Sequence, residues 1–396
     1  GSTDNNLIPD AVLEKNNIQL LINEVETIDR KAKTIKVLSG EQVGYDKLVL
    51  ATGSQPFIPP IKGVEKENVF AVWKDVDYLN GFKKCLSSGV KNLVVVGGGF
   101  IGVEFADECA RRKNLSVTII EMLPHCLQLA YDDEVCERAE QKLHDRGVNI
   151  RTSEKVVEFC GNGTVKSVKF EGGEEIKADV VLLGIGATAN SGLAEKSGLE
   201  IGPRGGVQVD LNMCTSDENI FSCGDCAEKK SFFTGQPTQL KLASIATSEA
   251  RIAGANLFGN QRRNTGTLGV FSTAFDGLAF CRAGMTEREA REYNFNYVTG
   301  TAEAPNRHPG KMPGMSRIWV KLLFEKATRN IIGGQITGGD SAGELINTVS
   351  ACIQKNMSIN DIATFQTGTH PALTASPIAY QLVNAAEDAE KKLRCG

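Results

Sequence analysis

The chain has 396 residues, of which 41% are apolar and 23% charged, as expected for a globular protein of two or three domains. Its formal net charge of −4 gives no sign of a nucleic-acid or membrane-surface partner. No apolar run approaches the roughly 18 residues of a membrane-spanning helix, and we expect neither a signal peptide nor a membrane partner.

Eleven cysteines are scattered along the chain without the spacing of a disulfide framework. Cys109 and Cys352 lie within helical patterns. This usage is typical of reduced, mostly buried thiols, so we expect a cytoplasmic protein.

The first part of the chain predicts short elements. Residues 7–17 favour a short helix, and the alternating segments 18–28 and 33–38 predict a β-meander. Residues 47–50 are expected to form a short buried strand, and residues 68–88 a helix. Three prolines between these last two segments are expected to break regular structure. They are Pro56, Pro59 and Pro60.

The most informative stretch is a strand–turn–helix–strand pattern. Residues 93–96 are apolar and β-branched, as in a buried parallel strand, and residues 103–112 predict a helix. Between them lie three glycines with the spacing G-x-G-x-x-G, which are Gly97, Gly99 and Gly102. A second apolar strand, 115–120, ends at Glu121. The whole unit predicts dinucleotide binding, the alternative being a glycine-rich structural turn.

Each residue of this unit has a physical role in that prediction. Gly97 permits a tight turn, Gly99 lets the backbone approach a pyrophosphate, and Gly102 lets the helix pack closely on the strand. The helix N-terminus offers free N–H groups to the pyrophosphate. Glu121 can accept hydrogen bonds from the ribose hydroxyls, which favours NAD over NADP.

The remainder continues an α/β pattern and then changes. Residues 132–146 predict an amphipathic helix that ends at Gly147, and residues 148–170 predict strands with a turn at 161–163. A buried strand at 179–184 and a helix at 242–257 follow. After Gly259 the pattern predicts a separate α+β module. Its strands are expected at 268–274, 279–283, 318–324 and 331–336, and its helices at 341–355 and 377–392.

Four motifs in fixed order carry a family resemblance. They are Ala51-Thr52-Gly53, the glycine motif ending at Glu104, Gly224-Asp225, and Thr369-His370-Pro371. The chain resembles the FAD-dependent pyridine nucleotide–disulfide oxidoreductases, in the branch with NADH oxidases, coenzyme A-disulfide reductases and persulfide reductases. The resemblance implies an α/β fold of Rossmann-like FAD- and NAD(P)-binding domains with parallel sheets. A C-terminal α+β dimerisation domain would follow and form a homodimer.

The resemblance also implies domain boundaries. Residues 1–64 would be the remaining part of an FAD-binding domain, and 65–190 a Rossmann-like NAD-binding domain. Residues 191–262 would continue the FAD-binding domain, and 263–396 would form the dimerisation domain. The family opens with its own FAD pyrophosphate motif, and no second glycine motif precedes Thr52. We therefore expect the first half of the FAD domain to be absent from this sequence, and FAD retention by this chain alone to be weak or absent.

Site residues follow position by position from the resemblance. Thr52 and Gly53 would abut the flavin nucleotide, and Leu242 and Ala243, after Lys241, would lie near the flavin ring. Asp225 would bind the ribityl chain, because a ribityl hydroxyl needs a firm acceptor. The alternative for Asp225 is an acid that merely starts a loop.

On the NAD side, Glu104 would lie near the nicotinamide, and Gly186 and Asn190 match the segment that closes the NAD domain. The activity implied is transfer of electrons from NADH through FAD to a disulfide or persulfide, coenzyme A-linked, to oxygen or to a small redox protein. Alternatives are a non-catalytic NAD-binding dimer scaffold or fragment, or a reductase of a redox protein such as rubredoxin. No metal is expected.

Three further features remain open. His370 is a candidate catalytic base, but Ala375 stands where glutathione reductase-like members carry a glutamate, so His370 could instead order a dimer interface. Cys223-x-x-Cys226 could be a redox pair, although a small buried residue at Cys223 is favoured. The basic segment 306–311 could grip an anionic substrate, but a solvated loop is favoured. His125 and His144 are expected to be surface or helix-end histidines without partners.

Overall fold

The computed structural model describes residues 8–309 and 311–395, and the chain folds into two compact units. The first contains residues 1–57, 73–84 and 187–267, and the second 58–72, 85–186 and 268–396. None of the described helices is long and apolar enough to cross a membrane.

The first unit begins with a short helix and a β-meander, as predicted. Helix α1 (Asp10–Lys15) precedes an antiparallel sheet of β1 (Val25–Asp29), β2 (Thr34–Val37) and β3 (Gln42–Gly44). The prediction was wrong for residues 18–24, which form no strand. The partner β2 has only four residues, so the ladder ends where Val25 pairs with Val37.

Two small ladders join the N-terminal segment of the first unit to its later segment, residues 187–267. The predicted strand β4 (Leu48–Leu50) pairs in parallel with β15 (Ile220–Ser222), and β5 (Ser54–Pro56) pairs antiparallel with β14 (Ala187–Ala189). Pro56 therefore ends a strand rather than breaking one, because a two-stranded ladder leaves an edge where no N–H is needed. The remaining elements of this unit are α5 (Gly192–Lys196), the 3₁₀ turn η2 (Gly224–Cys226), β16 (Lys229–Lys230), β17 (Pro237–Thr238) and the predicted helix α6 (Ala243–Asn256).

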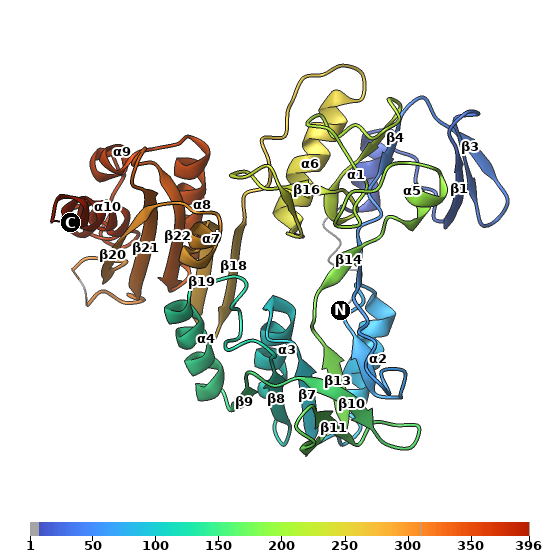
Figure 1. The fold of residues 1–396 in the computed structure, drawn as a ribbon, viewed down its shortest axis with the longest axis horizontal. Coiled ribbons are helices and arrows are strands. Elements are labelled where there is room, and N and C mark those ends of the chain that lie inside the picture. The colour runs from blue at the N-terminus through green and yellow to red at the C-terminus, as the bar shows by residue number, and fades with distance from the viewer. Residues whose placement is uncertain (1–7, 310, 396) are drawn as a thin grey trace. The chain divides into compact units, whose positions relative to one another are not determined.

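A parallel five-stranded sheet forms the centre of the second unit, with strand order β6-β13-β7-β8-β9 (Figure 1). The strands are β6 (Val69–Ala71), β7 (Asn92–Val96), β8 (Ser116–Ile120), β9 (Val148–Arg151) and β13 (Val180–Leu183). Every pairing in it is parallel, and β13 is buried along its whole length. The predicted strands at 93–96, 115–120 and 179–184 are thus confirmed, as is the predicted α/β fold class.

Helices and a small side sheet accompany this parallel sheet. They include α3 (Phe100–Ala110) and α4 (Asp133–Asp145), while β10 (Val156–Cys160), β11 (Ser167–Phe170) and β12 (Glu175–Lys177) form the side sheet. Helix α3 begins three residues earlier than predicted because Gly99 is its N-cap, so Gly102 lies inside the first turn. The predicted helix over 68–88 is in fact β6 followed by α2 (Val76–Leu86).

The C-terminal part of the second unit is a second, antiparallel sheet. Its strand order is β18-β19-β22-β21-β20, and α8 packs on β19 and β22 while α10 packs on β20 and β21 (Figure 1). Its strands are β18 (Val270–Phe275), β19 (Leu278–Gly284), β20 (Tyr297–Pro305), β21 (Arg317–Glu325) and β22 (Ile331–Gly338). Its helices are α7 (Glu287–Glu292), α8 (Ser341–Gln354), α9 (Ile359–Thr364), the short 3₁₀ turn η3 (Pro377–Ala379) and α10 (Gln381–Cys395).

Three of these elements were not predicted, namely β20, α7 and α9. Both helices carry a signal that the sequence does contain, a capping box. Thr286 is capped reciprocally with Glu289, and Ser358 with Asp361. Each helix is only six residues long, too short for apolar periodicity to reveal it.

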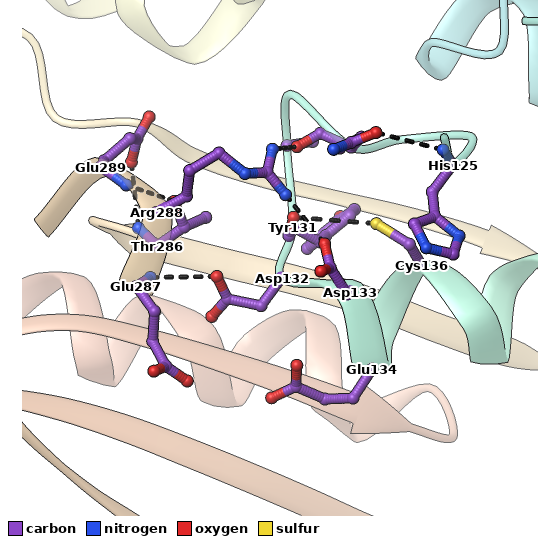
Figure 2. A network of polar contacts seen from close by, with 12 residues as sticks. His125, Tyr131, Asp132, Asp133, Glu134, Cys136, Thr286, Glu287, Arg288 and Glu289 are labelled. Carbon is purple, nitrogen blue, oxygen red and sulfur yellow. Dashed lines mark hydrogen bonds and ion pairs between the residues drawn. The ribbon is translucent and has the colours of Figure 1, made fainter. Parts of the chain in front are cut away.

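A buried lysine on β21 links the antiparallel sheet to the start of α4 and to α7. The Lys321 ammonium lies 2.6 Å from Asp132 Oδ2 and 2.9 Å from Glu287 Oε1, and it also pairs with Glu134. In Figure 2, Glu287 of α7 lies beside Asp132 and Glu134 at the start of α4. Burial alone would lower the pKa of Lys321, but the carboxylates outweigh it and raise the pKa. The ligand oxygens of these three acids lie within 4.8 Å of one another, close enough for a metal ion, but the Lys321 ammonium already pairs with all three.

Candidate functional site

The glycine turn after β7 has the geometry that its spacing predicted. Gly97 has a φ of +103°, and a Cβ added to Gly102 would lie only 1.9 Å from the Gly97 carbonyl oxygen. A Cβ on Gly99, by contrast, would meet no protein atom within 4 Å. The turn therefore needs glycine for its shape at two positions and leaves open space at the third, beside the N-terminus of α3. A pyrophosphate fits such an opening.

Glu121, at the end of β8, is held by the same turn. Its Oε2 accepts the Gly98 N–H at 2.6 Å, and its Oε1 accepts the Leu123 N–H at 2.8 Å. Each carboxylate oxygen keeps a second lone pair, so the group can still accept hydrogen bonds from a ligand. The prediction assigned Glu121 only to a ligand; in the structure it also orders the glycine turn.

Glu104 lies on the exposed side of α3, where its Oε1 accepts the hydroxyl of Thr273 at 2.8 Å. Thr273 is buried on β18 of the antiparallel sheet. The sequence alone gave no signal for this contact, because the two residues lie far apart in the chain. Gly186 follows β13, and a Cβ there would meet no protein atom within 4 Å.

Four predicted residues of the first unit lie close together, near the β5–β14 ladder and the turn η2. The Thr52 hydroxyl donates to the Asn190 carbonyl at 2.6 Å, and the Asn190 N–H donates to the Gly53 carbonyl at 2.9 Å. Asp225, in η2, accepts at its Oδ2 from the Ser54 hydroxyl at 2.8 Å. Ser54 directly follows the Thr52-Gly53 pair, so this hydrogen bond holds Asp225 beside that motif.

A narrow polar crevice adjoins Asp225. Lys241, Glu228 and Thr238 are among its lining residues. Lys241 is half-buried, and burial lowers its pKa while the charge of Asp225 opposes that shift. Lys74 adds a second cation, 3.3 Å from Asp225 Oδ2. Leu242 and Ala243 then begin α6.

These residues fit the nucleotide and ribityl part of a flavin cofactor. The Asp225 carboxylate is only 13% exposed and is an acceptor, as a ribityl hydroxyl requires. A Cβ added to Gly53 would meet no protein atom, so the backbone there is open to a ligand.

His370 is exposed, and its Nδ1 accepts the N–H of Ala372 at 3.2 Å. Ala375 is buried, and no described carboxylate pairs with His370. The neighbouring basic segment is tied to this stretch, since the His308 N–H donates to the Pro371 carbonyl at 3.0 Å. Arg307 donates to the Pro313 carbonyl, and Gly310 lies outside the described residues. The arrangement favours a structured loop.

The cysteines of the C-x-x-C motif are buried. Burial raises the pKa of Cys223 to about 11, which disfavours the nucleophilic thiolate. The Cys226 thiol contacts the Cys223 carbonyl at 3.3 Å, and no cysteine of the described chain forms a disulfide. These contacts support the small, buried interpretation. The prediction that His125 has no partner was wrong, because its Nδ1 lies 3.1 Å from Glu140 Oε2.

Comparison with known proteins places this geometry in context. Residues 4–250 match the family model described as pyridine nucleotide-disulphide oxidoreductase, and residues 270–378 match the dimerisation domain of the same family. Similar proteins include an NADH oxidase of Methanocaldococcus jannaschii, 31% identical over 97% of this chain and 86% of that protein.

Two other relatives carry names from sulfur chemistry. An NAD(P)H coenzyme A polysulfide/persulfide reductase of Pyrococcus horikoshii is 32% identical over 89% of this chain and 79% of its own length. The solved structure of an NAD-dependent persulfide reductase from A. fulgidus superposes with a TM-score of 0.91 at 31% identity. The superposition covers all of this chain and 73% of the persulfide reductase chain.

Proposed function

The chain belongs to the pyridine nucleotide-disulphide oxidoreductase family, and from this premise we propose that it oxidises NADH and reduces a persulfide or disulfide. It is an oxidoreductase, and FAD and NAD are the cofactors of its family. The observation that carries the proposal is the glycine turn, which has open space at Gly99 and the Glu121 carboxylate beside it.

We assign the NAD nucleotide to the second unit. Gly97, Gly99 and Gly102 form the turn against which the pyrophosphate rests, at the N-terminus of α3. Glu121 accepts from the ribose hydroxyls, and its negative charge would repel a 2′-phosphate, so NADH is preferred over NADPH. Glu104, oriented by Thr273, lies on the same helix and would approach the nicotinamide.

We assign FAD to the first unit, through Thr52, Gly53, Asp225, Leu242 and Ala243. Ser54 orients the Asp225 carboxylate, and Lys74 and Lys241 provide positive charge near it. When bound, FAD supplies the electron-transfer chemistry that amino-acid side chains lack.

Domain roles and cellular location follow from these assignments. Residues 1–64 and 191–262 would belong to the FAD-binding domain, 65–190 to the NAD-binding domain, and 263–396 to the dimerisation domain. Two copies would assemble through the last of these, and His370 would order that interface rather than act as a base. The reduced cysteines favour the cytoplasm.

The names of two relatives support a sulfur acceptor, and the M. jannaschii relative supports oxygen as the second candidate. The test measures NADH oxidation by the FAD-loaded enzyme with coenzyme A persulfide, coenzyme A disulfide or oxygen, the first two without air. With the persulfide we expect one sulfide and one coenzyme A thiol for each NADH oxidised, and with the disulfide two coenzyme A thiols for each NADH and no sulfide. Oxidation that requires oxygen would favour the second candidate, and NADH binding without any turnover would indicate a scaffold.

A further inference from the structure

A buried ion pair lies next to Asp225 and takes no part in the sites assigned above. Lys229 of β16 and Glu249 of α6 have side chains only 4% and 3% exposed, and Lys229 Nζ lies 2.8 Å from Glu249 Oε2. Both residues belong to the first unit.

The pair bonds both backbone polar groups of one residue, Gly224. Lys229 Nζ donates to the Gly224 carbonyl and to the Ala227 carbonyl, the latter at 2.9 Å. Glu249 Oε2 accepts the Gly224 N–H at 2.9 Å. Gly224 has a φ of +75°, the left-handed conformation that residues other than glycine rarely adopt. The pair therefore fixes the backbone conformation of the residue directly before Asp225.

Asp225 itself depends on this backbone for its position. Its carboxylate is oriented by the Ser54 hydroxyl, but the direction in which its Cα–Cβ bond leaves the chain is set by the Gly224–Cys226 turn. A shift at Gly224 would move the carboxylate relative to the Thr52-Gly53 motif. Ser54 and the buried pair thus constrain Asp225 in complementary ways.

The pair is an inefficient way to stabilise a fold. Removing two charges from water costs several kcal/mol for each ion, and apolar side chains of similar size are often as stabilising or more so. In addition, the other carboxylate oxygen of Glu249, Oε1, is buried and has no hydrogen-bond partner. Such an arrangement is better explained by the conformation it imposes than by the stability it gives.

We propose that Lys229 and Glu249 are positioning residues for FAD, which hold Gly224 so that Asp225 presents its carboxylate to a ribityl hydroxyl. The inference rests on the proposed role of Asp225 in FAD binding. It adds two residues that the flavin does not touch and that act only through the turn between them.

The test compares FAD affinity with stability in matched variants. Lys229→Met/Glu249→Leu removes both charges and leaves neither buried alone. Glu249→Gln keeps a side-chain carbonyl that can accept both the Gly224 N–H and the Lys229 ammonium. Arg30→Met/Asp217→Asn is the control, because this ion pair lies in the same unit, with Arg30 Nε 2.9 Å from Asp217 Oδ2, and does not contact Gly224. Each protein is stripped of FAD and its dissociation constant for FAD and its unfolding midpoint are measured.

We expect the Lys229→Met/Glu249→Leu variant to bind FAD at least about tenfold more weakly while its unfolding midpoint stays near that of the wild type. Glu249→Gln should bind FAD nearly as well as the wild type, and the control should show no change in FAD affinity. Unchanged affinity in the double variant, or affinity that merely follows the unfolding midpoint across all variants, would overturn the inference.

A companion variant separates this failure from failure of the proposed function. If the wild type does not bind FAD, or if Asp225→Ala binds it as tightly as the wild type, the assignment of Asp225 falls and the inference falls with it. If Asp225→Ala loses FAD while the double variant retains it, only the positioning role is overturned.

Discussion

The two turns to which we assign cofactors keep their shapes by different means. The Gly97–Gly102 turn depends on close packing, since the α-carbon of Gly102 lies against the Gly97 carbonyl and leaves no room for a methyl group, and Glu121 adds one hydrogen bond to the Gly98 N–H. The Gly224–Asp225 turn is held by a buried ion pair, Lys229 with Glu249. A turn held by packing requires particular small residues, whereas a turn held by charges requires partners that other elements supply.

The largest expected effect tests the packed turn. Gly102→Ala places a Cβ 1.9 Å from the Gly97 carbonyl oxygen, so the helix must move away from the strand, at a cost of about 3 kcal/mol or more. Denaturant unfolding measures this loss in the free energy of unfolding. The control is Gly81→Ala in α2, where a Cβ meets no protein atom within 4 Å, and which should be neutral or stabilising by up to about 1 kcal/mol. Equal stability of the two variants would show that packing does not hold this turn.

The next effect tests the charged turn. Lys229→Met alone leaves the Glu249 carboxylate buried without its partner, and we expect a loss of about 3 kcal/mol in the free energy of unfolding. Lys229→Met/Glu249→Leu should recover most of that loss, because no charge is then left unpaired. A double variant less stable than Lys229→Met would contradict the claim that the unpaired Glu249 charge causes the loss.

A smaller effect is expected from Gly99→Ala, which should change NADH binding without changing the stability of the packed turn. Gly99→Ala adds a methyl group in open space at an extended backbone position, so stability should be unchanged. The same methyl group would obstruct a pyrophosphate, and we expect NADH affinity to fall by about tenfold or more, measured by calorimetry. Undiminished affinity would mean that the nucleotide lies elsewhere.

The smallest effect concerns pH and the strand that leads into the packed turn. Burial would raise the pKa of Asp179, but hydrogen bonds from the Lys91 N–H and from the backbone and side chain of Asn92 outweigh it and lower the pKa below 3.8. The stabilisation is therefore complete above the usual pKa and is lost as pH falls through the lower folded value.

Asp179→Asn measures this contribution. The variant should be about 1 kcal/mol less stable than the wild type near neutral pH, and the difference should shrink below about pH 4. Denaturant unfolding at several pH values provides the test. A difference that stays constant or grows in acid would contradict the assignment of that pKa.

The difference between the turns also explains what the sequence could predict. The strand, the glycine spacing and Glu121 lie in one continuous stretch, so local patterns revealed both the fold and the candidate site. Asp225 was identified only through family resemblance, and its partner Ser54 comes from a distant strand. Nothing in the pattern around Lys229 or Glu249 shows that they meet, because helix periodicity does not reveal what a helix packs against. Glu104 and Thr273 were missed as a pair for the same reason.

The central claim, that each turn carries its own cofactor, is tested most directly by measuring FAD content and NADH affinity in Asp225→Ala and Gly99→Ala. We expect Asp225→Ala to lose FAD and keep its affinity for NADH, while Gly99→Ala keeps FAD and loses affinity for NADH. Loss of both cofactors from either variant while it remains folded, or loss of neither cofactor from both variants, would contradict this claim.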